Sequence, residues 1–328
     1  MSLLMPRSRL KNSLVAGIDL GGTNMQIGIV DRRNRIIGRE GRKTKSIEGK
    51  AEVIRRIVRG IERACENAGV GVRELAAVGI AAPGAIDIPR GVVLEAPNLK
   101  WYNVPLRDLL QKALKCKVVV DNDVNGAVWG ESQLGAARGK PDALGVWMGT
   151  GVGGGLVLNG KLHYGEFFTA GEVGQTTLFP YGKLGRRTVE DFCSRTGLSR
   201  TIHERLPKNR RSLLNEITHG TGKITGSRQL GRAYKKRDSL AVSVVNESAD
   251  LLGIAIAGWI TVLAIDTVVI GGGVSEALGS PYLRRITASF KRRVFPKRCR
   301  KCRLVMTHLK DDAGLLGAAL LARQALRT

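Results

Sequence analysis

The chain has 328 residues, of which 43% are hydrophobic and 25% are charged, as in ordinary globular proteins. This length and composition predict one large or two medium domains and exclude a peptide hormone or a small disulfide-stapled protein. Lys and Arg number 53 against 28 Asp and Glu, so the formal net charge of +25 predicts attraction for polyanions.

In chain order, the sequence begins with a basic leader, which a run of strands follows. Arg and Lys interrupt the apolar residues of 1–13, so no signal peptide is expected there. Residues 14–20 and 25–31 are apolar runs around a glycine turn and predict a β-hairpin, which a charged third strand follows. In residues 51–69 the apolar side chains fall on one stripe, which predicts an amphipathic helix that ends at Gly69.

The next elements alternate between strand and helix. Residues 76–84 and 117–123 predict buried strands, and residues 104–115 between them predict a helix. This order of elements predicts an α/β fold with a mixed sheet. From Leu144 the pattern of strand, glycine turn and strand recurs, which predicts two similar lobes that face one cleft.

The second half of the chain carries three further features. Residues 204–238 are the most charged and least apolar stretch, so we expect exposed helices or an insertion there. Residues 251–265 are uncharged, but they are fewer than the ~20 residues that a membrane span needs. Residues 311–326 carry Asp residues followed by small residues and leucines, which predicts a closely packed final helix.

The five cysteines show no disulfide framework, which favours a reducing compartment and a soluble, cytoplasmic protein. Cys299 and Cys302 form a CxxC pair, but a zinc site needs four ligands and only His308 lies near them in the sequence. We therefore expect two thiols in a basic surface loop, and no metal.

Two glycine-rich turns follow apolar strands, at Gly21-Gly22-Thr23 and at 149–155. Their bare backbone N–H groups and the hydroxyls of Thr23 and Thr150 are suited to phosphate oxygens. Asp19, beside the first turn, can hold a hydrated Mg²⁺ ion on those phosphates. Neither turn matches GxxxxGK[ST], and the GxGxxG at 149–154 lacks the helix that a dinucleotide fold requires. P-loop and Rossmann sites are therefore not expected.

Polar side chains gather where the strand over 117–123 ends, at Asp121, Asn122, Asp123 and Asn125. The carboxyl ends of strands are where α/β proteins hold their ligands. A second acidic group, AGEVGQ, follows the second glycine turn. We expect the two groups to close on the same cleft.

Eight segments of the chain, in this order, resemble the ROK family of sugar kinases, especially its bacterial glucokinases: AGIDLGGTNMQIGIVD, VGIAAPGAID, PNLKWYNVPL, VVVDNDVNGAVWGE, MGTGVGGGLVLNGKL, AGEVGQ, VVIGGGVSE and DDAGLLGAAL. The resemblance implies the actin-like ATPase (ribonuclease H-like) fold, with ATP on one side of a central cleft and a hexose on the other. It also implies a small α/β lobe over 14–132 plus 312–328 and a large α/β lobe over 133–311, after the basic leader over 1–13.

The resemblance also assigns roles to residues. It implies ATP-dependent phosphorylation of a hexose, with glucose to glucose 6-phosphate as the first expectation and Asp123 as the general base. The sugar-binding positions that it implies are Gly84, Asn122, Asp123, Glu172, Gln175 and Glu190. The ATP-binding positions that it implies are Asp19, Gly21, Gly22, Thr23, Gly149, Thr150, Gly151, Gly153, Gly271, Gly272 and Gly273, with Mg²⁺ near Asp19.

The chain departs from the family pattern at the zinc site. The family's ExGH histidine is Gln175 here, and its cysteine-rich zinc motif is replaced by FPYGKLGRRTVE. Because all the zinc ligands are missing together, we expect a zinc-free subtype in which Gln175 offers an amide to the sugar.

Three alternatives remain open at this point. The basic stretch 284–303 could bind polyphosphate as the donor, although the intact GGGVSE motif favours adenosine. The acceptor could be fructose, mannose or an N-acetylated sugar. A ROK-type regulator that binds nucleic acid is less favoured, because the first strand begins at Leu14 and leaves no room for a winged helix. A homodimer is expected, as is common in the family, and no membrane partner.

Overall fold

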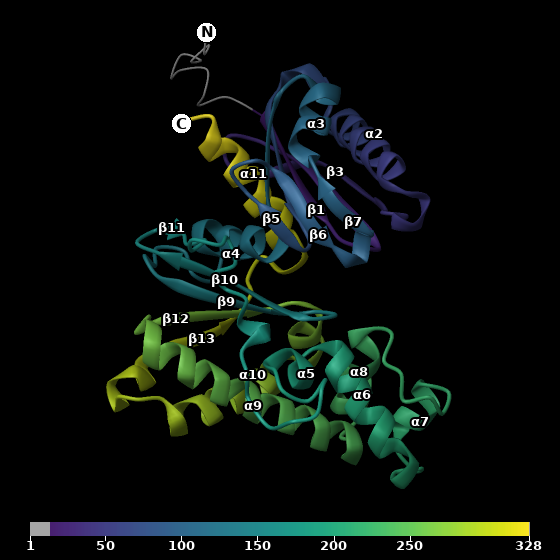
Figure 1. Ribbon diagram of the computed structural model, residues 1–328, viewed down its shortest axis with the longest axis vertical. Coiled ribbons are helices and arrows are strands. Elements are labelled where there is room, and N and C mark those ends of the chain that lie inside the picture. The colour runs from purple at the N-terminus through teal and green to yellow at the C-terminus, as the bar shows by residue number, and fades with distance from the viewer. Residues whose placement is uncertain (1–13, 328) are drawn as a thin grey trace. The chain divides into compact units, whose positions relative to one another are not determined.

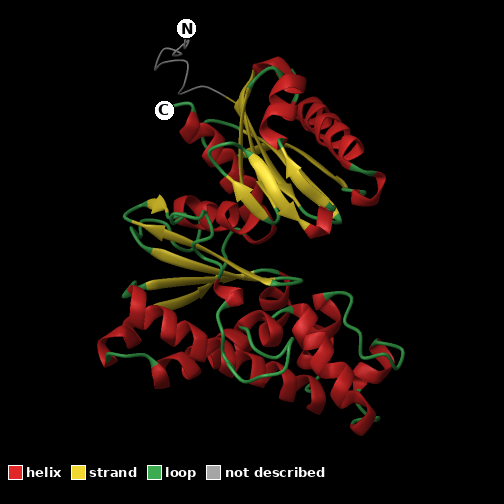
Figure 2. Cartoon of the chain, viewed as in Figure 1, coloured by secondary structure: helices red, strands yellow, loops and turns green. Residues whose placement is uncertain are grey.

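The computed structural model describes residues 14–327, and the expected basic leader lies outside them. The chain divides into two compact units (Figures 1 and 2). Unit 1 contains the described residues up to Gly135, the short segment Tyr164–Ala170 and the residues from Asp311 onward. Unit 2 contains Ala136–His163 and Gly171–Lys310.

Unit 1 is built on a five-stranded mixed sheet with the order β3-β2-β1-β4-β8. The first three strands are antiparallel, and β4 and β8 run parallel to β1. The predicted hairpin and mixed sheet are therefore confirmed. The strand bounds are β1 (Leu14–Leu20), β2 (Asn24–Val30), β3 (Ile36–Lys43), β4 (Leu75–Ala82) and β8 (Lys117–Asn122).

Helices cover both faces of this sheet (Figure 2). Since side chains alternate along a strand, Ile18 of β1 joins the core that includes α2, whereas Gly17 and Asp19 face α11. A Cβ atom at Gly17 would lie 2.1 Å from the carbonyl oxygen of Leu315, so only glycine permits this approach of helix and sheet. The helix bounds are α2 (Lys50–Ala68), α3 (Leu106–Leu114), α4 (Asp123–Leu134) and α11 (Ala313–Ala325).

A second, three-stranded antiparallel sheet in unit 1 was not predicted. It consists of β5 (Ala85–Asp87), β6 (Val92–Ala96) and β7 (Trp101–Val104). Its strands are short and separated by Pro89, Gly91 and Pro97, which are turn signals and hide the strand pattern. The sheet packs its buried side chains, such as Val93 and Trp101, into the core of unit 1.

Unit 2 repeats the sheet of unit 1. Its strand order is β11-β10-β9-β12-β13, with β10 antiparallel to β9 and β11, and β12 parallel to β9 and β13. The repeat predicted from Leu144 onward is therefore confirmed in the strand pairing. The strand bounds are β9 (Ala143–Met148), β10 (Val152–Leu158), β11 (Lys161–Leu162), β12 (Thr267–Gly271) and β13 (Arg303–Met306).

The helices of unit 2 correct two predictions. α7 and α8 bury Leu214, Leu230 and Ala233, so 204–238 is not simply an exposed insertion. α9 begins twelve residues before the uncharged run and has 25 residues, so it is long and apolar enough to cross a membrane. However, 67% of the apolar 18-residue stretch of this helix is buried inside the protein, as in the core helix of a soluble protein. The helix bounds are α5 (Val189–Cys193), α6 (Arg195–Arg205), α7 (Leu213–Ile217), α8 (Ser227–Lys235), α9 (Ser239–Leu263) and α10 (Gly273–Arg293).

The sequence suggested that the CxxC pair lies in a surface loop, but the structure places it in and next to a short helix. Residues Lys297–Lys301 form a short 3₁₀ helix that contains Cys299 and ends at Cys302. The Cys302 thiol is buried, and burial raises its pKa to about 12. Both cysteines are free.

Candidate active site

The first glycine turn joins β1 to β2 in unit 1. The amide of Gly21 donates to the carbonyl of Asn24 (2.9 Å), and the Thr44 hydroxyl donates to the carbonyl of Gly21 (2.6 Å). A Cβ atom at Gly22 would lie 2.9 Å from the Cβ of Asn98. The turn is thus held from two sides, while the side chain of Thr23 is exposed.

Asp19 lies on β1 directly before this turn, against the first turn of α11. A Cβ atom at Gly314 would lie 2.8 Å from the Asp19 carboxylate. Because glycine has no side chain, it leaves room for this carboxylate. Burial, and then the nearby Asp311 carboxylate, raise the pKa of Asp19 to about 6. A divalent cation would offset both effects, and Mg²⁺ commonly binds proteins through one or two carboxylates and substrate phosphates. Asp19 therefore fits the predicted magnesium role.

The end of β8 brings together three predicted sugar-binding residues. Asn122 caps α4, because its Oδ1 accepts from the amides of Val124 (2.9 Å) and Asn125 (3.2 Å). Its Nδ2 donates to the carbonyl of Gly84 (3.1 Å). Asp123 is the first residue of α4 and is partly exposed. The amide side chain of Asn122 is thus fixed beside the Asp123 carboxylate.

Gly84 needs to be glycine for two structural reasons. Its φ of 98° is a conformation that other residues rarely adopt, and a Cβ atom would lie 2.1 Å from the carbonyl oxygen of Glu95. The position therefore brings β4 close to the small sheet and presents its own carbonyl to Asn122.

The second glycine turn joins β9 to β10 in unit 2. Its carbonyls are held by the start of α6: the amide of Arg195 donates to Gly149 (2.9 Å), and the Thr196 hydroxyl donates to Thr150 (2.8 Å). Gly153 lies just beyond the turn, paired with β9. Among the described residues no acceptor pairs with the backbone amides of Thr150 and Gly151. These two donors are available to phosphate oxygens.

Sequence analysis missed Arg195. Its guanidinium donates to the Thr150 Oγ1 (2.7 Å), which adds a positive charge beside the second turn. This contact spans 45 residues, and no local pattern in the sequence indicates it.

Two predicted acidic residues of unit 2 lie near the same turn. The Glu190 Oε2 accepts from the amide of Val152 (2.8 Å), and it would lie 2.3 Å from a Cβ atom at Gly151. Burial, and then the charge of Glu190, raise the pKa of Glu172. Gln175 follows in the same short 3₁₀ turn with its amide bonded to the carbonyl of Glu172 (3.2 Å), and its side chain is exposed. The structure therefore brings Glu190 to the second turn and Glu172 near Glu190, whereas Gln175 is placed only through its backbone bond to Glu172.

The three glycines of the expected adenosine motif differ in their surroundings. A Cβ atom at Gly271 would lie 2.5 Å from the ring of Trp147, and one at Gly272 would lie 2.6 Å from the carbonyl oxygen of Met148. Packing alone therefore accounts for these two glycines. Gly273 begins α10 and is exposed. A nucleotide role for this motif stays a prediction.

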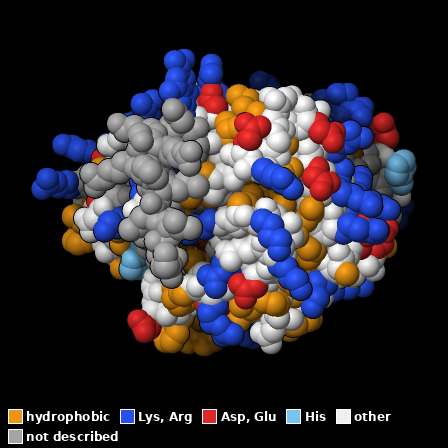
Figure 3. Space-filling view, turned by 90° about the horizontal axis from the view of Figure 1, so that it is seen from above, with side chains coloured by type: hydrophobic (Ala, Val, Ile, Leu, Met, Phe, Trp, Pro, Cys, Tyr) orange, Lys and Arg blue, Asp and Glu red, His pale blue; other side chains and the backbone are white. Residues whose placement is uncertain are grey.

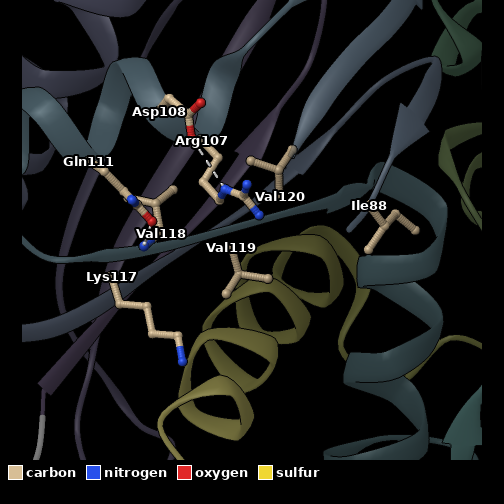
Figure 4. Close-up of a pocket in the computed structure, with 8 residues that line it drawn as sticks. All are labelled: Ile88, Arg107, Asp108, Gln111, Lys117, Val118, Val119 and Val120. Atoms are coloured by element: carbon tan, nitrogen blue, oxygen red, sulfur yellow. Dashed lines mark hydrogen bonds and ion pairs between the residues drawn. The ribbon is translucent and has the colours of Figure 1, made fainter. Parts of the chain in front are cut away.

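Among the described residues, two pockets lie near elements that carry predicted site residues. In unit 2, a pocket of about 670 Å³ lies beside the second turn, between α6 and the loop before α8, and Arg195, Thr196, Ser199, Arg200, His203, Thr221, Lys223, Ile224 and Thr225 line it. In unit 1, an open pocket of about 380 Å³ lies beside α3 and β8, with Ile88 also in its lining (Figure 4). No predicted site residue lines this second pocket, where Gln111 already accepts from the amide of Val118 (3.3 Å).

The segment that replaces the family's zinc motif is held by its own contacts. The amides of Leu178 and Phe179 donate to the carbonyl of Arg187 (2.7 and 3.0 Å), and the Arg187 Nε donates to Gly182 (2.6 Å). The Arg186 guanidinium lies over the ring of Phe192, 5.6 Å from its centroid. Within residues 14–327, no group of three or more His, Cys, Asp or Glu could hold a metal ion.

We expect the purified protein to contain no stoichiometric zinc and to keep its Tm in a strong zinc chelator, because these contacts hold the segment without metal. Elemental analysis and thermal melts with and without 1,10-phenanthroline measure this. One zinc per chain would contradict the expectation, and a Cys299→Ser variant would then show whether the CxxC pair holds it.

Comparison with known proteins places the chain among the ROK proteins. The model of the ROK family matches residues 15–325. A glucokinase of Thermotoga maritima is 33% identical over 98% of this chain and 99% of its own. The structure of a ROK family glucokinase from Streptomyces griseus in complex with glucose and AMPPNP matches with a TM-score of 0.82 and 33% identity, over 95% of this chain and all of that one. A xylose repressor of Caldicellulosiruptor bescii is 29% identical over 92% of this chain and 76% of its own. The predicted actin-like ATPase fold is thereby confirmed.

Proposed function

Because this chain belongs to the ROK family and is a sugar kinase, we propose that it transfers the γ-phosphoryl group of ATP to O6 of glucose. The observation that carries this proposal is Asp123 at the start of α4, directly after β8, with the side chain of Asn122 fixed beside it. The glucose and AMPPNP bound by the Streptomyces griseus glucokinase support the choice of acceptor and donor.

In the proposed mechanism Asp123 acts as the general base. It accepts the proton of the hexose hydroxyl while the new O–P bond forms and the bond to the β-phosphate oxygen of ADP breaks. We assign the binding of the other hexose hydroxyls to carbonyl, amide and carboxylate groups, at Gly84, Asn122, Glu172, Gln175 and Glu190.

We assign the binding of the ATP phosphates to the two glycine turns. The free amides of Thr150 and Gly151, with the hydroxyl of Thr23, are suited to phosphate oxygens. Asp19 would hold Mg²⁺, which offsets negative charge on the phosphates when it is bound. We assign the remaining nucleotide contacts to Gly21, Gly22, Gly149, Gly153 and Gly271–Gly273.

An acceptor screen tests the function directly. Glucose, fructose, mannose and N-acetylglucosamine are each offered with ATP and Mg²⁺, and ADP release is followed in a coupled assay. We expect the highest kcat/KM with glucose. A higher value for another hexose would change the assigned substrate, and no activity with any hexose would contradict the proposed reaction.

Polyphosphate is the alternative donor, because the chain carries a formal charge of +25. On the face seen in Figure 3, however, Lys and Arg side chains are spread among polar, acidic and apolar ones rather than gathered in one patch. Within 284–303, Arg285 and Arg292 both lie near Asp250. On this face, and at Arg285 and Arg292, the observations favour a solvated basic surface over a dedicated track for an anion.

We therefore expect ATP to support glucose phosphorylation at both low and moderate salt, and any activity with polyphosphate to be weaker and to collapse as salt rises. Exposed charges are screened beyond ~8 Å at physiological ionic strength, so long-range attraction for polyphosphate is lost first. The measurement is kcat/KM for each donor at two salt concentrations. A polyphosphate value equal to or above that of ATP at physiological salt would contradict the expectation.

We also propose that the protein acts as a soluble, cytoplasmic homodimer. Its five cysteines are all free, which fits a reducing compartment. Size-exclusion chromatography with light scattering measures the oligomeric state, and a monomer at micromolar concentration would contradict this proposal.

A further inference from the structure

A buried carboxylate that the proposed reaction does not use lies directly before the proposed base. Asp121 is 1% exposed, and its carboxylate accepts three hydrogen bonds. Its Oδ1 accepts from the amide of Asn122 (2.7 Å) and from the side-chain amide of Asn125 (3.1 Å), and its Oδ2 accepts from the hydroxyl of Tyr164 (2.6 Å). Burial raises the pKa of Asp121, and the three hydrogen bonds oppose that shift.

The three donors hold the turn at which β8 passes into α4. Asn122 precedes Asp123 in the chain, and Asn125 lies two residues after it, so the Asp121 carboxylate is bonded on both sides of the proposed base. These two donors belong to the turn itself. Tyr164 lies 43 residues further along the chain, and its hydrogen bond is the contact that fixes the carboxylate from outside the turn.

Tyr164 belongs to a short segment with a defined conformation. Residues Tyr164–Ala170 are part of unit 1, although the residues on either side of them belong to unit 2. The amide of Ala170 donates to the carbonyl of Tyr164 (3.0 Å), and the rings of Tyr164 and Phe168 lie 6.4 Å apart. The segment leads directly into Glu172, so one end of it holds the Asp121 carboxylate and the other precedes a proposed sugar-binding residue.

We propose that Tyr164 is a positioning residue for phosphoryl transfer, which orients Asp123 by fixing the Asp121 carboxylate through its hydroxyl. This inference rests on the proposed function, because it assumes that Asp123 is the base. The aromatic ring fills the same volume in tyrosine and phenylalanine. A Tyr164→Phe substitution therefore removes only the hydroxyl to which we assign this role. Without that donor, one oxygen of a buried carboxylate loses its partner, and the side chain is free to turn away from Asn122 and Asn125.

The first test is the Tyr164→Phe variant, assayed with glucose and ATP. We expect kcat to fall about tenfold while KM for both substrates stays within about twofold, because the hydroxyl orients the base and does not bind substrate. Tyr282→Phe is the matched control: it removes another buried hydroxyl, which bonds the Ser248 Oγ (2.9 Å) in unit 2. We expect that control to lose a similar amount of Tm and to keep its kcat. An unchanged kcat in Tyr164→Phe, or an equal loss of kcat in both variants, would overturn the proposal.

The second test asks whether Tyr164 acts through Asp121. In an Asp121→Asn background the hydroxyl has no carboxylate to fix, so adding Tyr164→Phe should change kcat by less than about twofold. Additive losses of kcat in the double variant would show that Tyr164 acts by another route, and would overturn the proposal.

The third test does not depend on activity, so it separates this inference from the proposed function. Hydrogen exchange at the amides of residues 122–126 is measured by mass spectrometry in the unchanged protein and in both tyrosine variants. We expect faster exchange at this turn in Tyr164→Phe alone. Unchanged exchange would overturn the inference even if glucose is phosphorylated. Faster exchange with no kinase activity would contradict the proposed function and leave the contact between Tyr164 and the turn established.

Discussion

The Asp123→Asn variant is expected to phosphorylate glucose with a kcat about 10²–10⁴-fold below that of the unchanged protein, because an amide cannot accept the hydroxyl proton at neutral pH. Asparagine has the same shape as aspartate and keeps an oxygen that can accept from the amide of Val124, as the Asp123 Oδ1 does at 2.9 Å. The start of α4 should therefore keep its structure, and the affinity for ATP should change little.

Steady-state kinetics with ATP and glucose measure this effect, and circular dichroism with a thermal melt confirms that the variant is folded. Asp108→Asn is the matched control, since it removes an exposed carboxylate from the first turn of α3 in the same unit. The control should keep its full kcat. If Asp123→Asn also keeps its full kcat, Asp123 is not the base.

Gly317→Ala is expected to lower the free energy of unfolding by about 3 kcal/mol or more, at the upper end of what overpacking costs. A Cβ atom at Gly317 of α11 would lie 1.7 Å from the carbonyl oxygen of Gly126 and 3.0 Å from the amide of Gly130, both in α4. These are backbone atoms of a helix and cannot turn aside, so the two helices must separate. Because α4 also carries Asp123, kcat should fall together with stability.

Urea unfolding followed by circular dichroism measures this loss. Gly258→Ala provides a control of opposite sign, because Gly258 lies exposed inside α9 and a Cβ atom there would meet nothing within 4 Å. Alanine at an open position inside a helix should stabilise the protein by about 0.5–1 kcal/mol. A Gly317→Ala variant as stable as the unchanged protein would show that α4 and α11 do not pack as closely as described.

Local patterns were sufficient to predict the five-stranded sheet of unit 1 and the first hairpin of unit 2. The alternation around Gly21, the stripe that ends at Gly69 and the apolar strand before Asp121 each lie within one short window, and each forms the expected element. The small sheet of unit 1 was missed because its strands are three to five residues long, which is too short for an alternating pattern to stand out. The 25-residue length of α9 was missed because polar residues near Ser239 interrupt its apolar run.

The candidate site was predictable only where its residues lie together in the sequence. Asn122 and Asp123 follow a buried strand directly, and that placement alone indicated a ligand site. The hydrogen-bond partners of Asp121 and Thr150 were not predictable, because Tyr164 and Arg195 reach them over 43 and 45 residues and neither belongs to a polar motif. Hydrogen bonds of this kind follow from the tertiary fold, which no single window of sequence contains.

The structural reason for a glycine is also difficult to predict from the sequence. The resemblance assigns Gly271 and Gly272 to ATP binding, and the structure adds a packing reason for both, because a Cβ atom would clash with Trp147 or Met148. A glycine needed for close packing and one needed for ligand access look the same in a sequence, because both positions simply lack a side chain. The two uses separate only when the neighbouring atoms are known.

The place of α11 in unit 1 has a consequence for how the protein is made. The strands of unit 1 leave the ribosome before unit 2, but the helix that covers β1 and β4 at Gly17 and Gly79 is synthesised only after unit 2. Until then the part of that face around Gly17 and Gly79 stays uncovered while unit 2 emerges, so unit 1 completes its core only after unit 2 has been synthesised. Ending translation before Asp311 should therefore leave a nascent chain that chaperones bind through its first sheet, although most of the sequence is already present.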